Sequence, residues 1–116
     1  MSFNPLAAVR EYLQDECGVP CRVEVPAARP DRFMTIERTG GACSLGVDRP
    51  IVAVQCWANS KAEAYILALT ARESLINLPN EVSQICRATV ESIYDFPDPD
   101  SDMRRYQLNL ELVVRL

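Results

Sequence analysis

The sequence contains no histidine among its 116 residues. Imidazole is the base in Ser-His-Asp and Cys-His catalysis and a zinc ligand in the His-Glu-x-x-His motif, so these three chemistries are excluded. The five cysteines are an odd number at irregular spacing, which cannot form a complete disulfide framework. We therefore expect reduced thiols, as in a protein of the cytosol.

A bound metal is not expected either. Cys17 and Cys21 are close enough in sequence to share a zinc ion, but Gly18 and Pro20 lie between them and no second pair of ligands follows. Cys56 lies in an apolar run, where we expect a small buried hydrophobic residue rather than a nucleophile. We predict no cofactor.

Long hydrophobic runs and an excess of basic residues are also missing. The apolar runs 51–54 and 112–114 are far shorter than the roughly 20 residues that cross a bilayer, and no export signal is recognisable at the N-terminus. Twelve Lys and Arg against 16 Asp and Glu give a formal net charge of −4, the wrong sign for general attraction to phosphates or anionic lipids. We expect a soluble protein that neither clamps nucleic acid nor binds a membrane.

What the chain does contain is typical of a globular protein. Apolar residues make up 48% and charged residues 24% of the sequence, close to the average of folded domains. A chain of this length can bury a core of its own but leaves no room for a second one. We expect residues 1–116 to form a single domain.

The N-terminal half predicts one helix and three strands. Asn4 and Pro5 suit the cap and the first position of a helix, in which apolar residues recur at helical spacing. The short segments that follow predict strands at 21–25, 33–38 and 51–57. The third of these is almost entirely apolar, which indicates a strand covered on both faces and central in its sheet.

The C-terminal half predicts a second helix and a hairpin. Ser60 and Glu63 have the spacing of a capping box, which would start a helix over 61–77. Period-2 alternation predicts paired strands at 85–94 and 104–116. The fold class is therefore α+β, a mainly antiparallel sheet with two helices packed on one face, in the order α-β-β-β-α-β-β.

The second helix is expected to bury a broad apolar stripe against the sheet. Trp57, at the end of the preceding strand, is expected to anchor the core beside this helix rather than to stack on a ligand. The residues placed on the stripe are Ala62, Ile66, Leu69 and Ile76, flanked by Tyr65, Ala68 and Leu75.

The loop 40–48 is the first candidate for function. It contains Gly40 and Gly41 but none of the motifs in which glycines cradle phosphates, so we expect a flexible loop. Two carboxylates before it, Glu24 and Glu37, could act as a general acid and base only if a pocket brought them together.

The acidic, Pro-rich loop 95–102 is the second candidate. Asp98, Asp100 and Asp102 have the opening spacing of a calcium-binding loop. The glycine and glutamate that should follow are missing, so we expect a protruding, solvated hairpin tip without an ion.

The segment 48–64, DRPIVAVQCWANSKAEA, combines several of these features. It resembles part of the tail terminator proteins of long-tailed bacteriophages and prophages, also called tail completion or tail-to-head joining proteins. In that family an Asp-Arg loop leads into a strand that ends near a Trp-Ala or Tyr-Ala pair, and a serine cap then starts a Glu-Ala helix. The order of predicted elements is similar over nearly the whole chain.

The resemblance implies a structural virion protein that is not an enzyme. Such proteins form a ring, commonly a hexamer, that caps the tail tube, stops its polymerisation and offers the surface to which the head connector docks. The expected partners are further copies of the chain, the major tail tube protein and the head-completion or connector protein. The implied location is the virion tail, assembled in the bacterial host cytoplasm, and DNA would pass through the acidic lumen without specific binding.

An assembly role defines a set of candidate interface residues. Both loops are expected to project from the ring, into the lumen or towards the head or tail partner. Arg104 and Arg105, at the base of the acidic loop, would pair with carboxylates of a neighbouring subunit or of their own chain. The candidates are Asp48, Arg49, Asp95, Asp98, Asp100, Asp102, Arg104 and Arg105.

Two other function classes fit the same sequence. One is a small cytosolic α+β ligand-binding domain or enzyme unrelated to phage assembly, with a pocket between helix and sheet. The other is a host regulatory interaction module. Neighbouring genes for a portal, a head-completion protein and a tail tube protein would favour the virion hypothesis, whereas a monomer with a closed ligand pocket would favour the enzyme.

Overall fold

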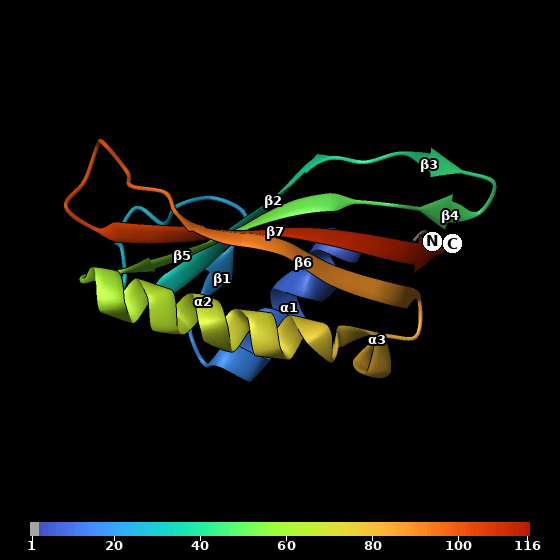
Figure 1. Cartoon of the computed structure of the whole chain (residues 1–116), viewed down its shortest axis with the longest axis horizontal. Helices are drawn as coiled ribbons and strands as arrows, with labels where there is room; N and C mark the ends of the chain where they lie inside the picture. Colours follow the sequence, from blue (N-terminus) through green and yellow to red (C-terminus); the bar gives the residue numbers. More distant parts are fainter. Residues whose placement is uncertain (1–2) are drawn as a thin grey trace.

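The computed structural model describes residues 3–116, which form one sheet covered on one face by helices (Figure 1). The helices are α1 (Pro5–Cys17), α2 (Lys61–Ile76) and α3 (Leu78–Glu81). The strands are β1 (Cys21–Arg22), β2 (Phe33–Gly40), β3 (Cys43–Ser44), β4 (Val47–Asp48), β5 (Ile51–Ala58), β6 (Ile85–Asp95) and β7 (Arg104–Arg115). The predicted α+β class is confirmed, with a more elaborate order of elements.

Strand β5 is central in the sheet, as its apolar sequence predicted. It pairs antiparallel with β2 on one side and with β7 on the other. Strand β7 also pairs with β6, which confirms the C-terminal hairpin. The sheet is mainly antiparallel, and the short β1 departs from this by running parallel to β2.

Both long helices begin at the predicted caps. The Ala7 N–H donates to Asn4 Oδ1 at 3.1 Å, and the Glu63 N–H donates to Ser60 Oγ at 3.2 Å. These bonds satisfy amides at the first turn that have no partner inside the helix. Helix α1 ends at Gly18, whose φ of +67° is a conformation that glycine adopts with little cost.

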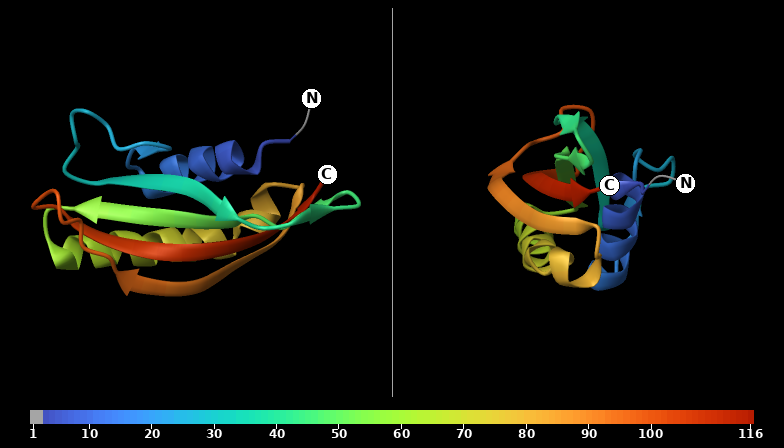
Figure 2. Two further views of the ribbon diagram at one scale, coloured as in Figure 1. Left: turned by 90° about the horizontal axis from the view of Figure 1, so that it is seen from above. Right: turned by 90° about the vertical axis from the view of Figure 1, so that its right-hand side faces the viewer.

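The core lies between the sheet and the helices. Every second residue of a strand faces the same side, and on β2, β5 and β7 that side packs against α1 and α2. The right-hand view of Figure 2 shows α1 and α2 next to each other on one side of the sheet. One hydrophobic cluster includes Val9, Leu13, Met34, Ile36, Val52, Val54, Leu67, Leu75, Leu108, Leu110 and Leu112.

The prediction of which face of α2 is buried was wrong. The predicted stripe points outward: Ile66 and Ile76 are 59% and 64% exposed, Ala62 is exposed and Leu69 is half-buried. Helix α2 is apolar on two sides, so its periodicity fits either one, and the side with three alanines can approach the sheet more closely. The buried residues are Ala64, Leu67, Ala68, Ala71 and Leu75, so of the predicted set only the flanking Ala68 and Leu75 are buried.

Two segments of the N-terminal half also differ from the prediction. Only Cys21–Arg22 of the strand expected at 21–25 pairs with β2, and Val23 beyond it is 57% exposed. The loop 40–48 is not open, because β3 and β4 form a hairpin within it. Within residues 3–116, no helix has the length and apolar character needed to cross a membrane.

Candidate functional site

The face of the sheet without helices carries a row of hydrogen-bonded polar side chains, the polar row. Trp57 Nε1 donates to Thr35 Oγ1 at 3.0 Å, and Thr35 Oγ1 donates to Gln55 Oε1 at 2.9 Å. Gln55 Nε2 donates to Gln107 Oε1 at 3.0 Å, and Gln107 Nε2 donates to the Tyr94 hydroxyl at 2.6 Å. The row crosses β2, β5, β7 and β6, so it fixes the register of four strands.

Trp57 lies at one end of the polar row and anchors two loops. Its ring stacks on Phe33 with centroids 5.3 Å apart and an interplanar angle of 8°. The guanidinium carbons of Arg29 and Arg105 lie 5.2 Å and 4.8 Å from the Trp57 ring centroid, in cation–π contact. Trp57 is buried as predicted, at 2% exposed, but on the face away from the helices.

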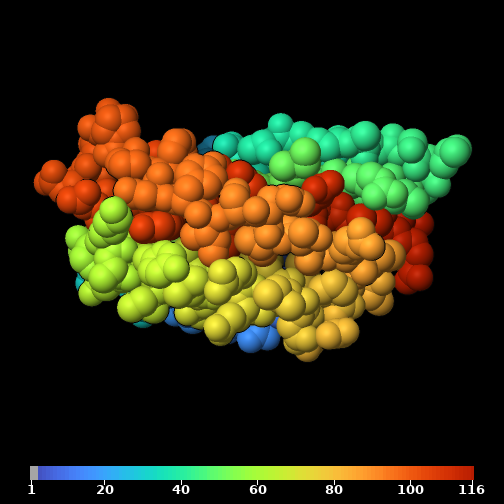
Figure 3. All heavy atoms as spheres, in the orientation of Figure 1, coloured from blue at the N-terminus to red at the C-terminus, as the bar shows by residue number. Residues whose placement is uncertain are grey.

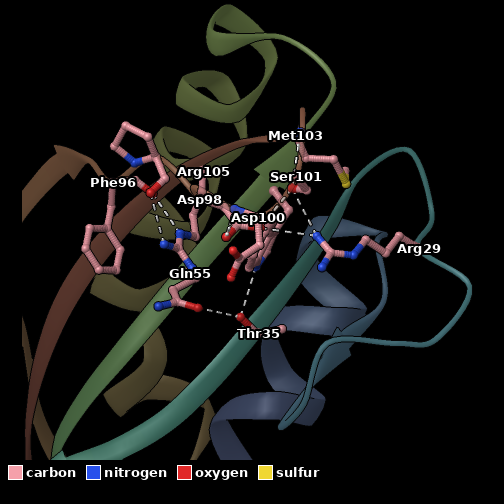
Figure 4. Close-up of polar contacts among 11 residues, drawn as sticks. Arg29, Thr35, Gln55, Phe96, Asp98, Asp100, Ser101, Met103 and Arg105 are labelled. Carbon is pink, nitrogen blue, oxygen red and sulfur yellow. Dashed lines mark hydrogen bonds and ion pairs between the residues drawn. The ribbon is translucent and has the colours of Figure 1, made fainter.

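The acidic loop folds around the carboxylate of Asp98, as the close-up in Figure 4 shows. Asp98 accepts hydrogen bonds from the Asp100 N–H at 3.1 Å and the Ser101 hydroxyl at 2.8 Å, and Arg29 Nη1 lies 3.5 Å from its Oδ2. The Ser101 hydroxyl and the Asp100 amide lower the pKa of Asp98 below its usual value. The carboxylate of Asp98 therefore has its hydrogen-bond and ion-pair partners within its own chain, whereas Asp100 and Asp102 are exposed.

The residues at the base of this loop have different roles. Arg105 donates from Nε to the Phe96 carbonyl at 2.7 Å and from Nη2 to the Pro97 carbonyl at 3.2 Å, so it braces the loop. Asp95 lies 3.5 Å from Lys61 Nζ. Arg104 is exposed and forms no ion pair with the residues that the structure describes.

The β3–β4 hairpin and its flanking residues, 41–50, form an arm. Its base is held by Arg38, whose Nη1 lies 2.7 Å from Asp48 Oδ2 and whose Nη2 donates to Asp48 Oδ1 at 2.8 Å. The same guanidinium donates to the Gly40 and Gly41 carbonyls at 3.0 Å and 3.2 Å. Asp48 is only 7% exposed. Its carboxylate thus holds the arm to β2, while Arg49 is exposed.

This ion pair predicts a loss of stability in acid. The hydrogen bonds from Arg38 lower the pKa of Asp48 below its usual value. The pair therefore stabilises the fold above the unfolded-state pKa of about 4 and loses this effect as the pH falls through the folded-state pKa. Asp48→Asn should lower the free energy of unfolding by about 1–2 kcal/mol at pH 7, a modest value because water screens the exposed Arg38.

Urea unfolding at pH 7 and at pH 3 checks this prediction. The difference between the wild type and Asp48→Asn should shrink towards pH 3, because below the unfolded-state pKa of about 4 the unfolded chain takes up the proton that the Arg38 pair keeps off the folded carboxylate. Two stability curves that run parallel over this range would contradict it.

The structure separates the two predicted loops. The molecule measures 44 Å along its longest axis, and the arm and the acidic loop lie at its opposite ends (Figures 1 and 3). The candidate residues therefore form two groups, one with Asp48 and Arg49 and the other with Asp95 to Arg105. Whether either group contacts a partner stays a prediction.

The two carboxylates considered for acid–base chemistry do meet at one small cavity. Glu24 and Glu37 line a cavity of about 110 Å³ at the outer edge of β2, beside Thr35 and Gln55. Both glutamates are exposed, and the volume is well below the roughly 300 Å³ at which small-molecule pockets begin. Among residues 3–116, no three His, Cys, Asp or Glu side chains are grouped to hold a metal ion.

Two of the five cysteines are buried, two are exposed, and Cys17 is half-buried. Cys56 is 0% exposed, as predicted for a small hydrophobic residue, and burial raises the pKa of its thiol well above the usual value. Burial also raises the pKa of Cys21, to about 12. Thiols in this state are poor nucleophiles at neutral pH, whereas Cys43 and Cys86 are exposed.

A solved structure shares this architecture. One chain in the virion of a native gene transfer agent (GTA) particle matches with a TM-score of 0.70, covering 97% of this chain and 95% of that chain at 14% identity. The two chains share one fold. A structure from Akkermansia muciniphila matches 94% of this chain and 47% of that chain, with a TM-score of 0.47 and 15% identity. No model of a known protein family matches the sequence, and no curated protein sequence matches it either.

Three features of these surfaces were missed from the sequence. Arg38 gave no signal in the sequence, because its partner Asp48 lies at the far end of the loop 40–48, which was expected to be flexible. The polar row needs the pairing register of four strands, which alternation within single strands does not reveal. The turn at Leu45 and Gly46 was hidden because leucine occupies a position that usually holds asparagine.

Proposed function

We propose that the chain is a structural, non-enzymatic component of a phage-like virion. The observation that carries this proposal is the fold shared with a chain of the GTA virion over 97% of this chain and 95% of that one. Because the agreement extends over nearly the whole of both chains, the likeness is more than a shared local motif, and it favours a similar role in a particle. The resemblance of segment 48–64 to tail terminators narrows the role to the end of the tail.

In this role, copies of the chain form a ring that caps the tail tube, ends its polymerisation and provides the surface for joining the head. The sheet supports lateral assembly, because β6 pairs only with β7 among the described residues and its outer edge has no strand beside it. Open edges of this kind are protected or paired with another chain. Contacts between two different surfaces can close into a ring.

Charge supports passage of DNA through such a ring. Each copy has a formal net charge of −4, so a ring of six is strongly negative and repels phosphates. The genome then slides through the lumen without specific binding. The exposed Asp100, Asp102 and Arg104 supply a charged end for one of the two axial partners, the major tail tube protein or the head connector protein.

Deletion of the gene from a producing prophage tests this proposal. We expect overlong tails without heads in negative-stain images, and complementation by the wild-type gene should restore joined particles of normal length. Particles of normal length with attached heads in the deletion strain would contradict the terminator role.

A further inference from the structure

The tip of the arm has two features that its own chain does not explain. Leu45 is 102% exposed and has a φ of +46°, and Gly46 follows it with a φ of +79°. A two-residue turn with both φ angles positive favours Asn-Gly, because a leucine in this conformation brings its Cβ close to the backbone. Leu45 thus makes the isolated hairpin less stable and buries nothing within it.

The arm is nevertheless built rigidly. Strand β4 pairs with β7 at Val47 and Asp48. The Leu116 N–H donates to the Gly46 carbonyl at 2.8 Å, and the Arg49 N–H donates to the Ala42 carbonyl at 2.9 Å. A tip held in this way loses little conformational entropy when it binds.

A second unexplained surface lies on the outward side of α2. Ile66, Leu69 and Ile76 form an apolar stripe there, with Ile66 and Ile76 more than half exposed. A helix that is apolar on both sides is normally covered on both. The space-filling view shows α2 along the lower surface, well separated from the arm (Figure 3), so the arm does not cover this stripe in its own chain.

We propose that the arm of one copy docks on the outward stripe of α2 of the next copy. Leu45 packs against Ile66 and Leu69. Arg49 pairs with Glu73, which lies in the middle of the stripe; both are exposed, and neither has an ion-pair partner within residues 3–116. Because the two surfaces differ, the contact is head-to-tail and closes into a ring, so it rests on the proposed function.

The spacing of the groups matches on the two surfaces. Arg49 lies three strand residues beyond the turn, so it is about 10 Å from the tip along the arm. Glu73 follows Ile66 by seven residues, which is about 10.5 Å along a helix. An arm lying along α2 with Leu45 at Ile66 therefore brings Arg49 to Glu73.

The substitution Leu45→Asn separates assembly from folding. Asparagine suits the turn better, so the melting temperature should stay equal or rise, while loss of the apolar contact should weaken self-association by about tenfold or more. Sedimentation and light scattering of the full chain measure the association. The matched control Val23→Asn, which removes another exposed apolar side chain outside both surfaces, should leave association unchanged.

Charge exchange and cross-linking locate the contact. Arg49→Glu and Glu73→Arg should each weaken association, and the double variant should restore it. The native Cys43 on the arm of one copy should form a disulfide with Thr70→Cys on α2 of the next copy. The background variant Cys86→Ser removes the other exposed cysteine. The disulfide is expected both in the purified protein and in assembled tails. Glu91→Cys on the edge strand β6 should give no such link.

Several results would overturn the arm proposal without touching the terminator role. One such result is wild-type association of Leu45→Asn, and another is failure of the charge exchange to restore assembly. The cross-linking experiment would overturn it if Cys43 formed a disulfide with Glu91→Cys or with another protein. Absence of the disulfide between Cys43 and Thr70→Cys, both in the purified protein and in tails, would do the same. Overlong, headless tails after gene deletion would still support termination in each case.

Discussion

Replacing Trp57 with alanine is expected to lower the free energy of unfolding by about 3–5 kcal/mol, the usual cost of removing a large buried aromatic side chain. The ring is 2% exposed and stacks on Phe33, so the substitution leaves a cavity on the open face of the sheet. It also removes the surface on which Arg29 and Arg105 hold their loops. The hydroxyl of Thr35 loses its hydrogen-bond donor as well.

The control for this prediction is Trp57→Phe. It keeps a ring against Phe33 but loses the indole N–H, so we expect a smaller loss of about 1–2 kcal/mol. Trp57 is the one tryptophan of the chain, so unfolding is best followed by far-ultraviolet circular dichroism in urea rather than by fluorescence. An alanine variant within about 1 kcal/mol of the wild type would show that the stack contributes little to stability.

Gly41→Ala is expected to destabilise the fold by about 2–4 kcal/mol. Gly41 has a φ of +103°, which side chains other than glycine rarely adopt. A Cβ at this position would also collide with the Arg49 carbonyl on the opposite side of the arm. The backbone must therefore shift at the base of the arm, next to the carbonyl that accepts from Arg38.

The neighbouring glycine supplies a matched control. Gly40 does not lie in the positive-φ region, and a Cβ there would have no atom within 4 Å. Gly40→Ala should therefore be neutral or stabilise the protein by up to about 1 kcal/mol, because it restricts the unfolded chain. Urea unfolding of both variants checks the contrast, and equal effects at the two positions would contradict the proposed collision.

Local signals in the sequence predicted much of the fold. The caps at Asn4 and Ser60, the apolar run of β5 and the alternation of β7 each depend on neighbours a few residues away, and the structure confirms all four. The stripe on α2 failed for a different reason. Its helix is apolar on two sides, and only packing against the sheet decides which side is buried.

The candidate surfaces were less predictable than the fold. The composition of segment 95–102 predicted the acidic loop, but it did not predict that Asp98 and Arg105 form hydrogen bonds within that loop. The arm could not be predicted from the sequence, because Arg38 and Asp48 come into contact only when β2 and β4 have formed. Contacts of this kind depend on tertiary structure, which periodicity in one segment does not encode.

The polar row gives the molecule an uneven response to acid. The amides of Gln55 and Gln107 carry no ionisable group, so acid leaves their hydrogen bonds across the strands intact. The arm and the acidic loop, at the two ends of the molecule, depend instead on Asp48 and Asp98. The carboxylates of these two residues have lowered pKa values and lose their contribution to stability when they are protonated. As the pH falls, the molecule should therefore loosen from its tips inward, with the arm and the acidic loop released before the middle of the sheet.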